Sequence, residues 1–234
     1  MSLIKTIFTI IFFIAIISCE TTEQEIIVTH SPDTQVVTKD MKITQPPITQ
    51  NDSTIISNNF SVILDNQSMA KYEVTETFAD VPNPVKAIGT TNNIIGQINF
   101  DDNNLNTTSS VIKIDLRTLS SDSDRRDNYI KKRTLDTSNF PFAELKINSI
   151  EGLIFPLTNN TFSNVTIKGM LKIKDLESET IWNGNLQIKD NETSGKFETS
   201  ISFSQFNLKK PLTFRVISVE DEFDLIIEFD SNIK

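Results

Sequence analysis

The chain is poor in the residues on which most catalytic and metal sites depend. Its 234 residues include one cysteine, one histidine and six glycines, and a single cysteine excludes an intramolecular disulfide. The only histidine, His30, lies in a polar stretch near the N-terminus, so a folded domain beyond it has no Ser–His or Cys–His pair. Six scattered glycines do not form a phosphate-binding loop. We therefore expect no enzyme, no cofactor and no metal site.

Basic residues are also scarce. The chain has 22 Lys and Arg against 31 Asp and Glu, a net charge of −9, which argues against nucleic acid as a partner because phosphate binding requires clustered cations. Trp and Tyr are few as well, at one and two residues, whereas Phe occurs 16 times. Phenylalanine rings suit an apolar interior better than a surface that stacks on sugars or bases.

The first residues read as a secretory signal. One cation, Lys5, precedes an apolar run at 7–17 that is too short to span a bilayer. Ser18–Cys19 closes the run and resembles the bacterial lipobox, in which the cysteine becomes acylated. We expect a lipoprotein signal peptide at 1–18, lipid attachment at Cys19 and a flexible tether at 19–60, with the domain at 61–234 held outside the cytoplasm on a bacterial membrane, in the periplasm or at the cell surface.

Alternation of apolar and polar residues dominates the rest of the chain. It predicts about eight antiparallel strands, each apolar on one face. These strands are Ala70–Val74, Ile94–Phe100, Ile112–Leu116, Leu145–Ile147, Val165–Ile173, Trp182–Ile188, Phe197–Phe203 and Phe223–Phe229. Such strands form a barrel or a sandwich, and the length of several of them favours a tall, tilted barrel. The segment Glu76–Lys86 reads as a loop at the mouth.

One charged stretch, Leu116–Pro141, breaks this alternation and predicts a helix. Ser121 is a suitable N-cap, and Asp122 and Asp124 suit the first turn, with cations following toward the end. Together with Asp127 these acids also offer oxygens for calcium, but the spacing lacks the glycine and terminal Glu of an EF-hand. Helix capping explains them better.

At several points the sequence resembles the YceI-like family. The matching segments occur in the family's order and cover most of the region beyond Phe60. They are Ile88–Thr91, Ile95–Asp101, Asp115–Leu119, Ser121–Asp122, Arg126–Asn128, Phe140–Pro141, Gly169–Ile173 and Phe203–Leu208. The resemblance implies an all-β fold, an extended lipocalin-like antiparallel β-barrel with a short helix capping one end. It also implies an apolar channel that holds polyisoprenoids or other long-chain amphiphiles.

The inward apolar faces are then the candidate channel lining. The residues assigned to it are Tyr72, Val74, Ile98, Phe100, Ile112, Ile114, Phe142, Leu145, Ile147, Val165, Ile167, Trp182, Leu186, Phe197, Ile201, Phe203, Leu225 and Ile227. At the mouth we place Asp122, Arg126 and Asp127. Two interpretations of this charged group stay open: it orients a polar head, or it attaches the helix to the rim of the barrel.

The sequence thus predicts a membrane-anchored protein that binds or carries a long-chain lipid, such as a polyisoprenoid, a quinone or an acyl chain, without catalysis. The alternative is a structural or adhesion domain of the cell envelope with a solid core. Alternation alone does not separate these, because the same faces line a channel in a wide barrel and form the core of a sandwich. The expected partners are the lipid and the membrane through acylated Cys19, and a homodimer stays open.

Overall fold

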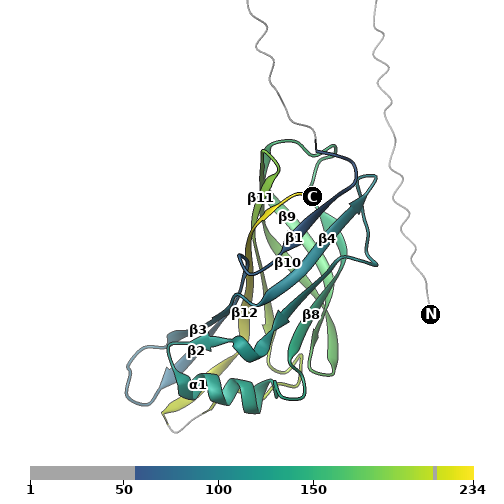
Figure 1. Cartoon of the computed structure of the whole chain (residues 1–234). Helices are drawn as coiled ribbons and strands as arrows, with labels where there is room; N and C mark the ends of the chain where they lie inside the picture. Colours follow the sequence, from purple (N-terminus) through teal and green to yellow (C-terminus); the bar gives the residue numbers. More distant parts are fainter. Residues whose placement is uncertain (1–55, 213–214) are drawn as a thin grey trace, which may run out of the picture. The chain divides into compact units, whose positions relative to one another are not determined.

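A computed structural model describes residues 56–212 and 215–234, which form one twelve-stranded antiparallel sheet with a helical segment at one end (Figure 1). The strands are β1 (Phe60–Leu64), β2 (Met69–Phe78), β3 (Val85–Thr91), β4 (Ile94–Asp101), β5 (Asn104–Leu105), β6 (Val111–Asp115), β7 (Ser120–Ser121), β8 (Phe142–Glu151), β9 (Asn160–Ile173), β10 (Leu176–Lys189), β11 (Glu192–Ser202) and β12 (Val216–Asn232). The helical segment consists of the 3₁₀ turn η1 (Leu116–Thr118), helix α1 (Asp124–Tyr129) and the π-helical stretch η2 (Ile130–Thr134).

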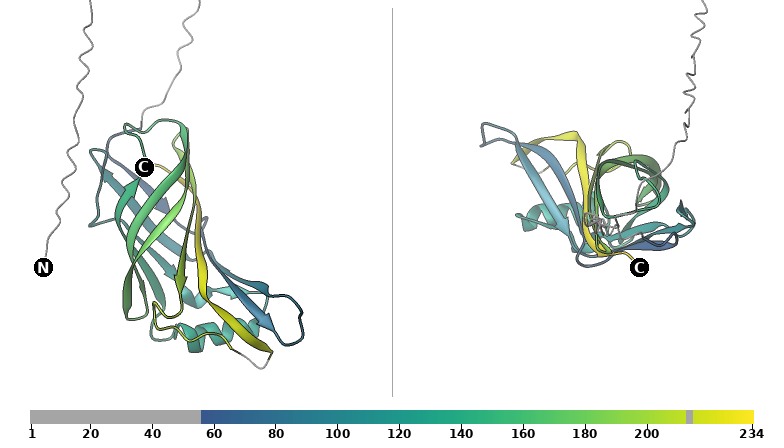
Figure 2. Two further views of the ribbon diagram at one scale, coloured as in Figure 1. Left: turned by 180° about the vertical axis from the view of Figure 1, so that it is seen from behind. Right: turned by 90° about the horizontal axis from the view of Figure 1, so that it is seen from above.

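The sheet curls until its two sides meet at one end. The strand order is β1-β4-β6-β8-β9-β10-β11-β12-β2-β3-β7, with β5 beside β4. Ser61 and Lys234 exchange backbone hydrogen bonds of 2.8 and 3.0 Å, and Val62 bridges Ile233, so β1 joins the end of β12. Seen from above, the sheet is curled, and β2 and β3 spread away from the curled part to one side (Figure 2). We call the side where β1 meets β12 the closed end and the opposite side, where α1 lies, the helix end.

At the helix end the sheet splits. Only residues 65–68 separate β1 from β2, and only Asn92 and Asn93 separate β4 from β3. Beyond these turns β2 and β3 diverge from β1 and β4 toward α1, while β2 stays paired to β12 (Figure 1). Ser68, which is fully buried, accepts a 3.0 Å hydrogen bond from Asn92 at its carbonyl oxygen and so links the two turns. The barrel is therefore wider at the helix end.

The alternation of apolar and polar residues in the sequence corresponds to an alternation of buried and exposed side chains along the strands. In β9 Val165, Ile167, Leu171 and Ile173 are buried and the side chains between them are more exposed, with an irregularity between Phe162 and Val165 where the pairing with β10 shifts register. The eight predicted strands are all present, and the antiparallel, lipocalin-like fold class is confirmed.

Several boundaries differ from the prediction. The sheet also contains β1, β3, β5 and β7. Ile56 and Phe60 belong to the buried core, so the domain begins before Ser61. The predicted mouth loop is shorter than expected, since β2 runs to Phe78 and β3 starts at Val85, which leaves residues 79–84 outside the strands.

The predicted N-cap is also corrected. Ser121 is extended in β7, paired with Gly89, and the cap of α1 is Ser123, whose hydroxyl accepts a hydrogen bond from the amide of Arg126. Both serines suit an N-cap by residue type. The structure selects Ser123 because the amide and hydroxyl of Ser121 donate to Asp127, which holds Ser121 against the sheet.

Candidate functional site

An apolar cavity of about 100 Å³ lies inside the helix end. Strand residues such as Val74, Leu145 and Leu171 form its walls, and Ile130 of η2 lines it together with Leu119 and Leu135, the residues that follow η1 and η2. The π-helical stretch brings Ile130 and Thr134 to the same buried side, a placement consistent with the frequent use of π-helical turns at functional sites. The lining is almost entirely hydrocarbon, so this cavity is suited to an alkyl or isoprenoid chain.

The closed end is packed more tightly. Its remaining cavity is about 30 Å³, and it is filled by phenylalanine pairs, Phe60 with Phe100 at a centroid distance of 4.5 Å and Phe197 with Phe229 at 6.4 Å. These rings occupy the space that a ligand chain would need.

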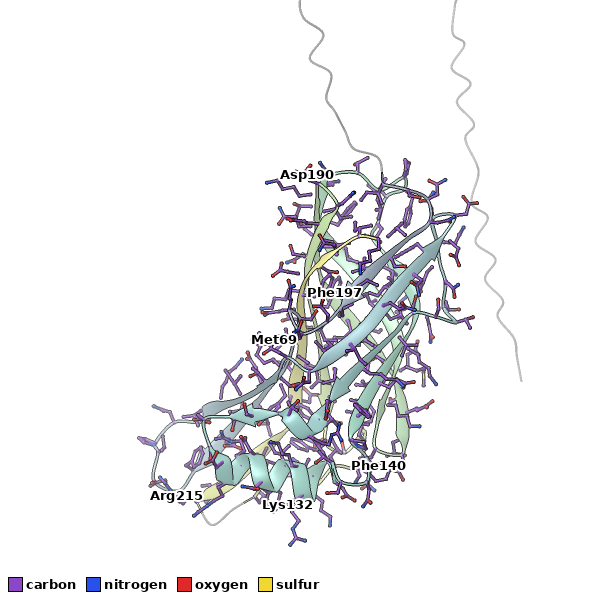
Figure 3. All side chains as sticks on the ribbon, in the orientation of Figure 1. Met69, Lys132, Phe140, Asp190, Phe197 and Arg215 are labelled. Carbon is purple, nitrogen blue, oxygen red and sulfur yellow. The ribbon has the colours of Figure 1, made fainter. Side chains whose placement is uncertain are left out.

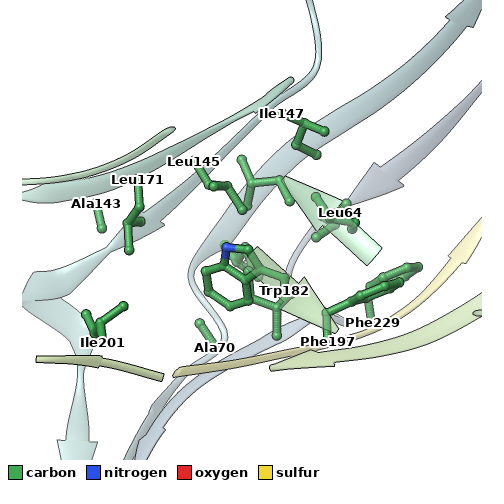
Figure 4. Packing of buried hydrophobic residues seen from close by; sticks show 14 of the residues in the cluster. Leu64, Ala70, Ala143, Leu145, Ile147, Leu171, Trp182, Phe197, Ile201 and Phe229 are labelled. Carbon is green, nitrogen blue, oxygen red and sulfur yellow. The ribbon is translucent and has the colours of Figure 1, made fainter. Parts of the chain in front are cut away.

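Trp182 lines the larger cavity and is fully buried in the core. Its ring is 2% exposed and lies among Leu64, Ala70 and Leu145 (Figure 4). The indole Nε1 donates to Thr180 at 2.9 Å, and the Thr180 hydroxyl donates to the Gly169 carbonyl at 3.3 Å. The indole N–H is thus satisfied within the apolar core, as a buried tryptophan requires.

Most of the predicted lining residues are inside the sheet, but they fall into separate groups. The larger cavity is lined by Tyr72, Val74, Ile114, Leu145, Trp182, Phe203, Leu225 and Ile227. The smaller cavity is lined by Ile98, Phe100, Val165, Ile167, Leu186 and Phe197. Ile112, Ile147 and Ile201 are buried core residues that line neither cavity.

Phe142 was assigned wrongly. It is 45% exposed and packs beneath the Arg117 guanidinium, 5.3 Å from the ring centroid. In this part of β8 the inward face carries Ala143, Leu145 and Ile147, and Phe142 lies on the opposite face because side chains alternate along a strand.

Sequence reasoning missed the part of the lining that comes from outside the strands. Leu119, Leu135, Leu208 and Pro211 belong to turns and to the helical segment, where no period of two marks an inward residue. A weak signal was available for Leu135, because it lies five residues beyond the apolar Ile130 on the charged segment.

The charged residues predicted for the mouth lie together around a buried ion pair. Glu76 of β2 is 1% exposed, and its Oε2 lies 3.1 Å from Nη2 of Arg126 in α1. Arg126 also donates to Asp122 and, at 3.2 Å, to the Ser121 hydroxyl. A buried carboxylate is stable only when it is paired and hydrogen-bonded. Glu76 therefore depends on Arg126, a partner 50 residues away in the chain.

Asp127 attaches the helix to the sheet. Its carboxylate accepts the Ser121 amide at 3.0 Å and the Ser121 hydroxyl at 2.6 Å, and Ser121 is paired with β3. On the other side of the segment, the Thr134 hydroxyl donates to the carbonyl of Lys209 at 2.8 Å. Of the two interpretations of the mouth residues, attachment to the rim describes what Asp127 does.

Tyr72 stands where the apolar cavity approaches these charges. Its ring lies over Gly89, where an added Cβ would come within 2.2 Å of the ring, so a larger residue at that position would require the ring to move. The Tyr72 hydroxyl is buried and has no hydrogen-bond partner among the described residues. Burial, the largest cause, raises the pKa of Tyr72 above its usual range. Arg126 and the nearby Ser121 side chain lower the pKa, and Asp127 and Glu76 raise it.

A second, polar pocket of about 250 Å³ lies beside the apolar cavity. Glu76, Arg125, Arg126 and Arg215 are among its lining residues, and Pro211 lines both spaces. Figure 3 places Arg215 and Lys132 at this end and Phe197 and Asp190 toward the other. The helix end therefore offers apolar and polar surfaces side by side, an arrangement that suits an amphiphile.

Comparison with known proteins agrees with this geometry. The YceI-like domain family matches residues 63–231. The chain belongs to the YceI-like family. Two solved structures share the YceI-like fold seen here: BcnA of Burkholderia cenocepacia (15% identity, TM-score 0.54, 72% of this chain and 99% of that one) and a polyisoprenoid binding domain from Saccharophagus degradans implicated in plant cell wall breakdown (12%, 0.57, 74% and 98%). No curated protein sequence matches the chain.

Other expectations for this YceI-like chain concern residues beyond the described part. The signal peptide, Cys19, His30 and most of the tether lie outside the described residues. Among the residues that are described, no helix is long and apolar enough to cross a membrane. Within the same residues, no three His, Cys, Asp or Glu side chains gather in a way that would hold a metal ion.

Proposed function

We propose that this chain binds a long-chain apolar or amphiphilic lipid, such as a polyisoprenoid, a quinone or an acyl chain, inside the helix end, without catalysis. The observation that carries the proposal is the hydrocarbon-lined cavity beneath the helical segment. Each buried CH₂ contributes about 0.8 kcal/mol, so a chain of about a dozen carbons is held without strong polar contacts. The similar domain from Saccharophagus degradans is described as polyisoprenoid binding, which supports the same ligand class.

Binding of a long chain requires the interior to widen. The cavity of about 100 Å³ is smaller than the roughly 300–1,000 Å³ of most ligand pockets. The helical segment is the element best placed to move. Among the described residues, the short strand β7, which lies between η1 and α1, pairs with β3 at only two positions, Gly89 and Thr90. We infer that the ligand enters by displacing this segment and not by opening the closed end.

We also propose that the domain is tethered to a bacterial membrane outside the cytoplasm through acylated Cys19. The apolar run at 7–17 followed by Ser18–Cys19 supports this proposal. Mass spectrometry of protein expressed with its N-terminus in a bacterium tests it. A mature N-terminus at acylated Cys19 is expected, and an intact Met1 or an unmodified Cys19 would contradict it.

A cavity-filling variant tests lipid binding. Ala143 is 5% exposed and lines the cavity, so Ala143→Phe places a ring in the proposed chain site. Lys146→Phe on the exposed face of the same strand is the matched control. Binding is measured by native mass spectrometry of co-purified lipid and by displacement of a fluorescent fatty acid. We expect Ala143→Phe to lose most binding and Lys146→Phe to retain it.

The same experiment decides against the alternative function. If the wild-type protein carries no lipid and does not bind the fluorescent fatty acid, the chain is a structural domain with a solid core. Equal binding by Ala143→Phe and the wild type would place the ligand elsewhere.

A further inference from the structure

The inward face of β2 connects the apolar cavity to the polar pocket. Ala70, Tyr72 and Val74 line the cavity, and Glu76 and Phe78, next along the same face, line the pocket. A chain bound in the cavity therefore has its polar end near Tyr72 and Glu76.

Tyr72 is the polar side chain on this path whose hydrogen-bonding capacity is unused. The nearby Ser121 hydroxyl is fully engaged: it donates to Asp127 at 2.6 Å and accepts from Arg126 and from the Ser123 amide, each at 3.2 Å. A hydroxyl offers one donor and two acceptor positions, so Ser121 has none left for Tyr72. A buried donor without a partner is destabilising, and such a group in a native structure requires an explanation.

The surrounding charges restrict what the hydroxyl can meet. Glu76 and Asp127 are two carboxylates around Tyr72 against the single guanidinium of Arg126, and Asp122 also pairs with Arg126. An anionic head placed directly against the Tyr72 hydroxyl would meet more negative than positive charge, because Arg125 and Arg215 line the adjoining polar pocket and not the cavity. A cationic head has no lone pair to accept the phenolic proton.

We propose that Tyr72 donates a hydrogen bond to an uncharged oxygen on the ligand's head, such as a ketone, quinone, ester or amide carbonyl. This inference rests on the proposed lipid binding and specifies the class of lipid. Gly89 has a part in it, because a Cβ at that position would displace the Tyr72 ring from where it lies. Tyr72 is then the residue that distinguishes an oxygen-bearing lipid from a plain hydrocarbon.

Three probes with chains of similar length test the proposal: hexadecane, heptadecan-2-one and hexadecyl phosphate. Their affinities are measured by displacement of N-phenyl-1-naphthylamine from the delipidated protein. The variants are Tyr72→Phe and, as the matched control, Tyr129→Phe, which alters the only other tyrosine. We expect the wild type and Tyr129→Phe to prefer the ketone to hexadecane by about three- to tenfold, the equivalent of one hydrogen bond. Tyr72→Phe should bind both equally and bind hexadecane as the wild type does.

Thermal unfolding without lipid gives a second readout. Removing an unpartnered buried hydroxyl should raise the Tm of Tyr72→Phe by about 2–4 °C, whereas loss of a structural hydrogen bond would lower it.

A ketone preference that persists in Tyr72→Phe, an equal loss of hexadecane binding, a lowered Tm, or tightest binding of hexadecyl phosphate would each overturn the inference. Failure of the wild type to bind any probe would instead overturn lipid binding itself, and this inference with it. Binding of hexadecane and the ketone with equal affinity by the wild type would overturn only the role of Tyr72.

Discussion

The two ends of the sheet interior are built from different kinds of contact. The closed end is filled by stacked phenylalanines and is joined by backbone hydrogen bonds between Ser61 and Lys234. The helix end contains the larger apolar cavity, the buried Glu76–Arg126 pair and the unpartnered Tyr72 hydroxyl. The closed end therefore accounts for much of the packing stability, and the features suited to a ligand are concentrated at the helix end.

The largest expected effect comes from breaking the buried ion pair. Arg126→Leu leaves Glu76 buried without its partner, and such a change costs about 3–5 kcal/mol of unfolding free energy. Urea denaturation measures it. The adjacent exposed Arg125, which has no ion pair among the described residues, supplies the control Arg125→Leu. The double variant Glu76→Leu/Arg126→Leu should regain much of the loss, and a double variant as unstable as Arg126→Leu would refute the pairing argument.

Truncating a phenylalanine at each end separates stability from binding. Phe197→Ala at the closed end should cost about 3 kcal/mol and leave lipid-probe affinity nearly unchanged. Phe203 lines the larger cavity and contacts Phe223 at a centroid distance of 4.6 Å, so Phe203→Ala should change probe affinity as well as stability. Urea denaturation and probe displacement on both variants give the comparison. Equal changes in affinity would show that the chain site extends through both ends.

The attachment of α1 is expected to have a smaller effect. Asp127→Asn removes the charge that accepts the Ser121 amide and hydroxyl, and charge-assisted hydrogen bonds contribute about 1.5–3 kcal/mol, part of which a neutral amide oxygen retains. We expect a loss of about 1 kcal/mol in urea denaturation and faster uptake of lipid in stopped-flow measurements. Asp124→Asn on the exposed side of the same helix is the control, and an equal effect of both would contradict the attachment.

The closed end could be predicted from the sequence better than the helix end. Strands such as β9 and β11 alternate large apolar with polar residues, so the sequence alone identifies the residues on their inward faces. In β3 the inward residues Ala87, Gly89 and Thr91 are small, and the strand was missed because small residues give no apolar alternation. β1 was missed because its Phe60, Val62 and Leu64 follow a polar, weakly periodic stretch.

The site itself depends on contacts that sequence cannot locate. Glu76 lies in what reads as a loop, yet it is buried by pairing with Arg126. Nothing local indicates that Tyr72 would lack a partner, because that follows from Ser121 being fully engaged by Asp127, Arg126 and Ser123. The structure brings the predicted mouth residues together around Ser121 and Arg126, and only the tertiary structure shows which of them attaches the helix.

Acid should affect the helix end first, and this is the smallest of the expected effects. A hydrogen bond from Arg117 lowers the pKa of Asp115. The pKa of Asp221 is lowered mainly by a hydrogen bond from the Ser204 hydroxyl and, to a lesser extent, by one from Lys210. Both carboxyl groups lie at the helix end. Because their folded pKa values are below the unfolded ones, their stabilisation is complete above the usual pKa near 3.8 and is lost as the pH falls through the folded value.

An NMR titration from about pH 5 to about pH 2, which spans the unfolded pKa and the lowered folded values, measures this order of events. Amide signals of η1 and α1 should broaden or shift before those of β1 and β4. Asp115→Asn and Asp221→Asn should each reduce the dependence of unfolding free energy on pH in this window, because each removes one group that takes up a proton more readily in the unfolded chain. Simultaneous loss of signals at both ends would mean that the domain unfolds as one unit in acid. The helix end would then be no more sensitive to acid than the closed end.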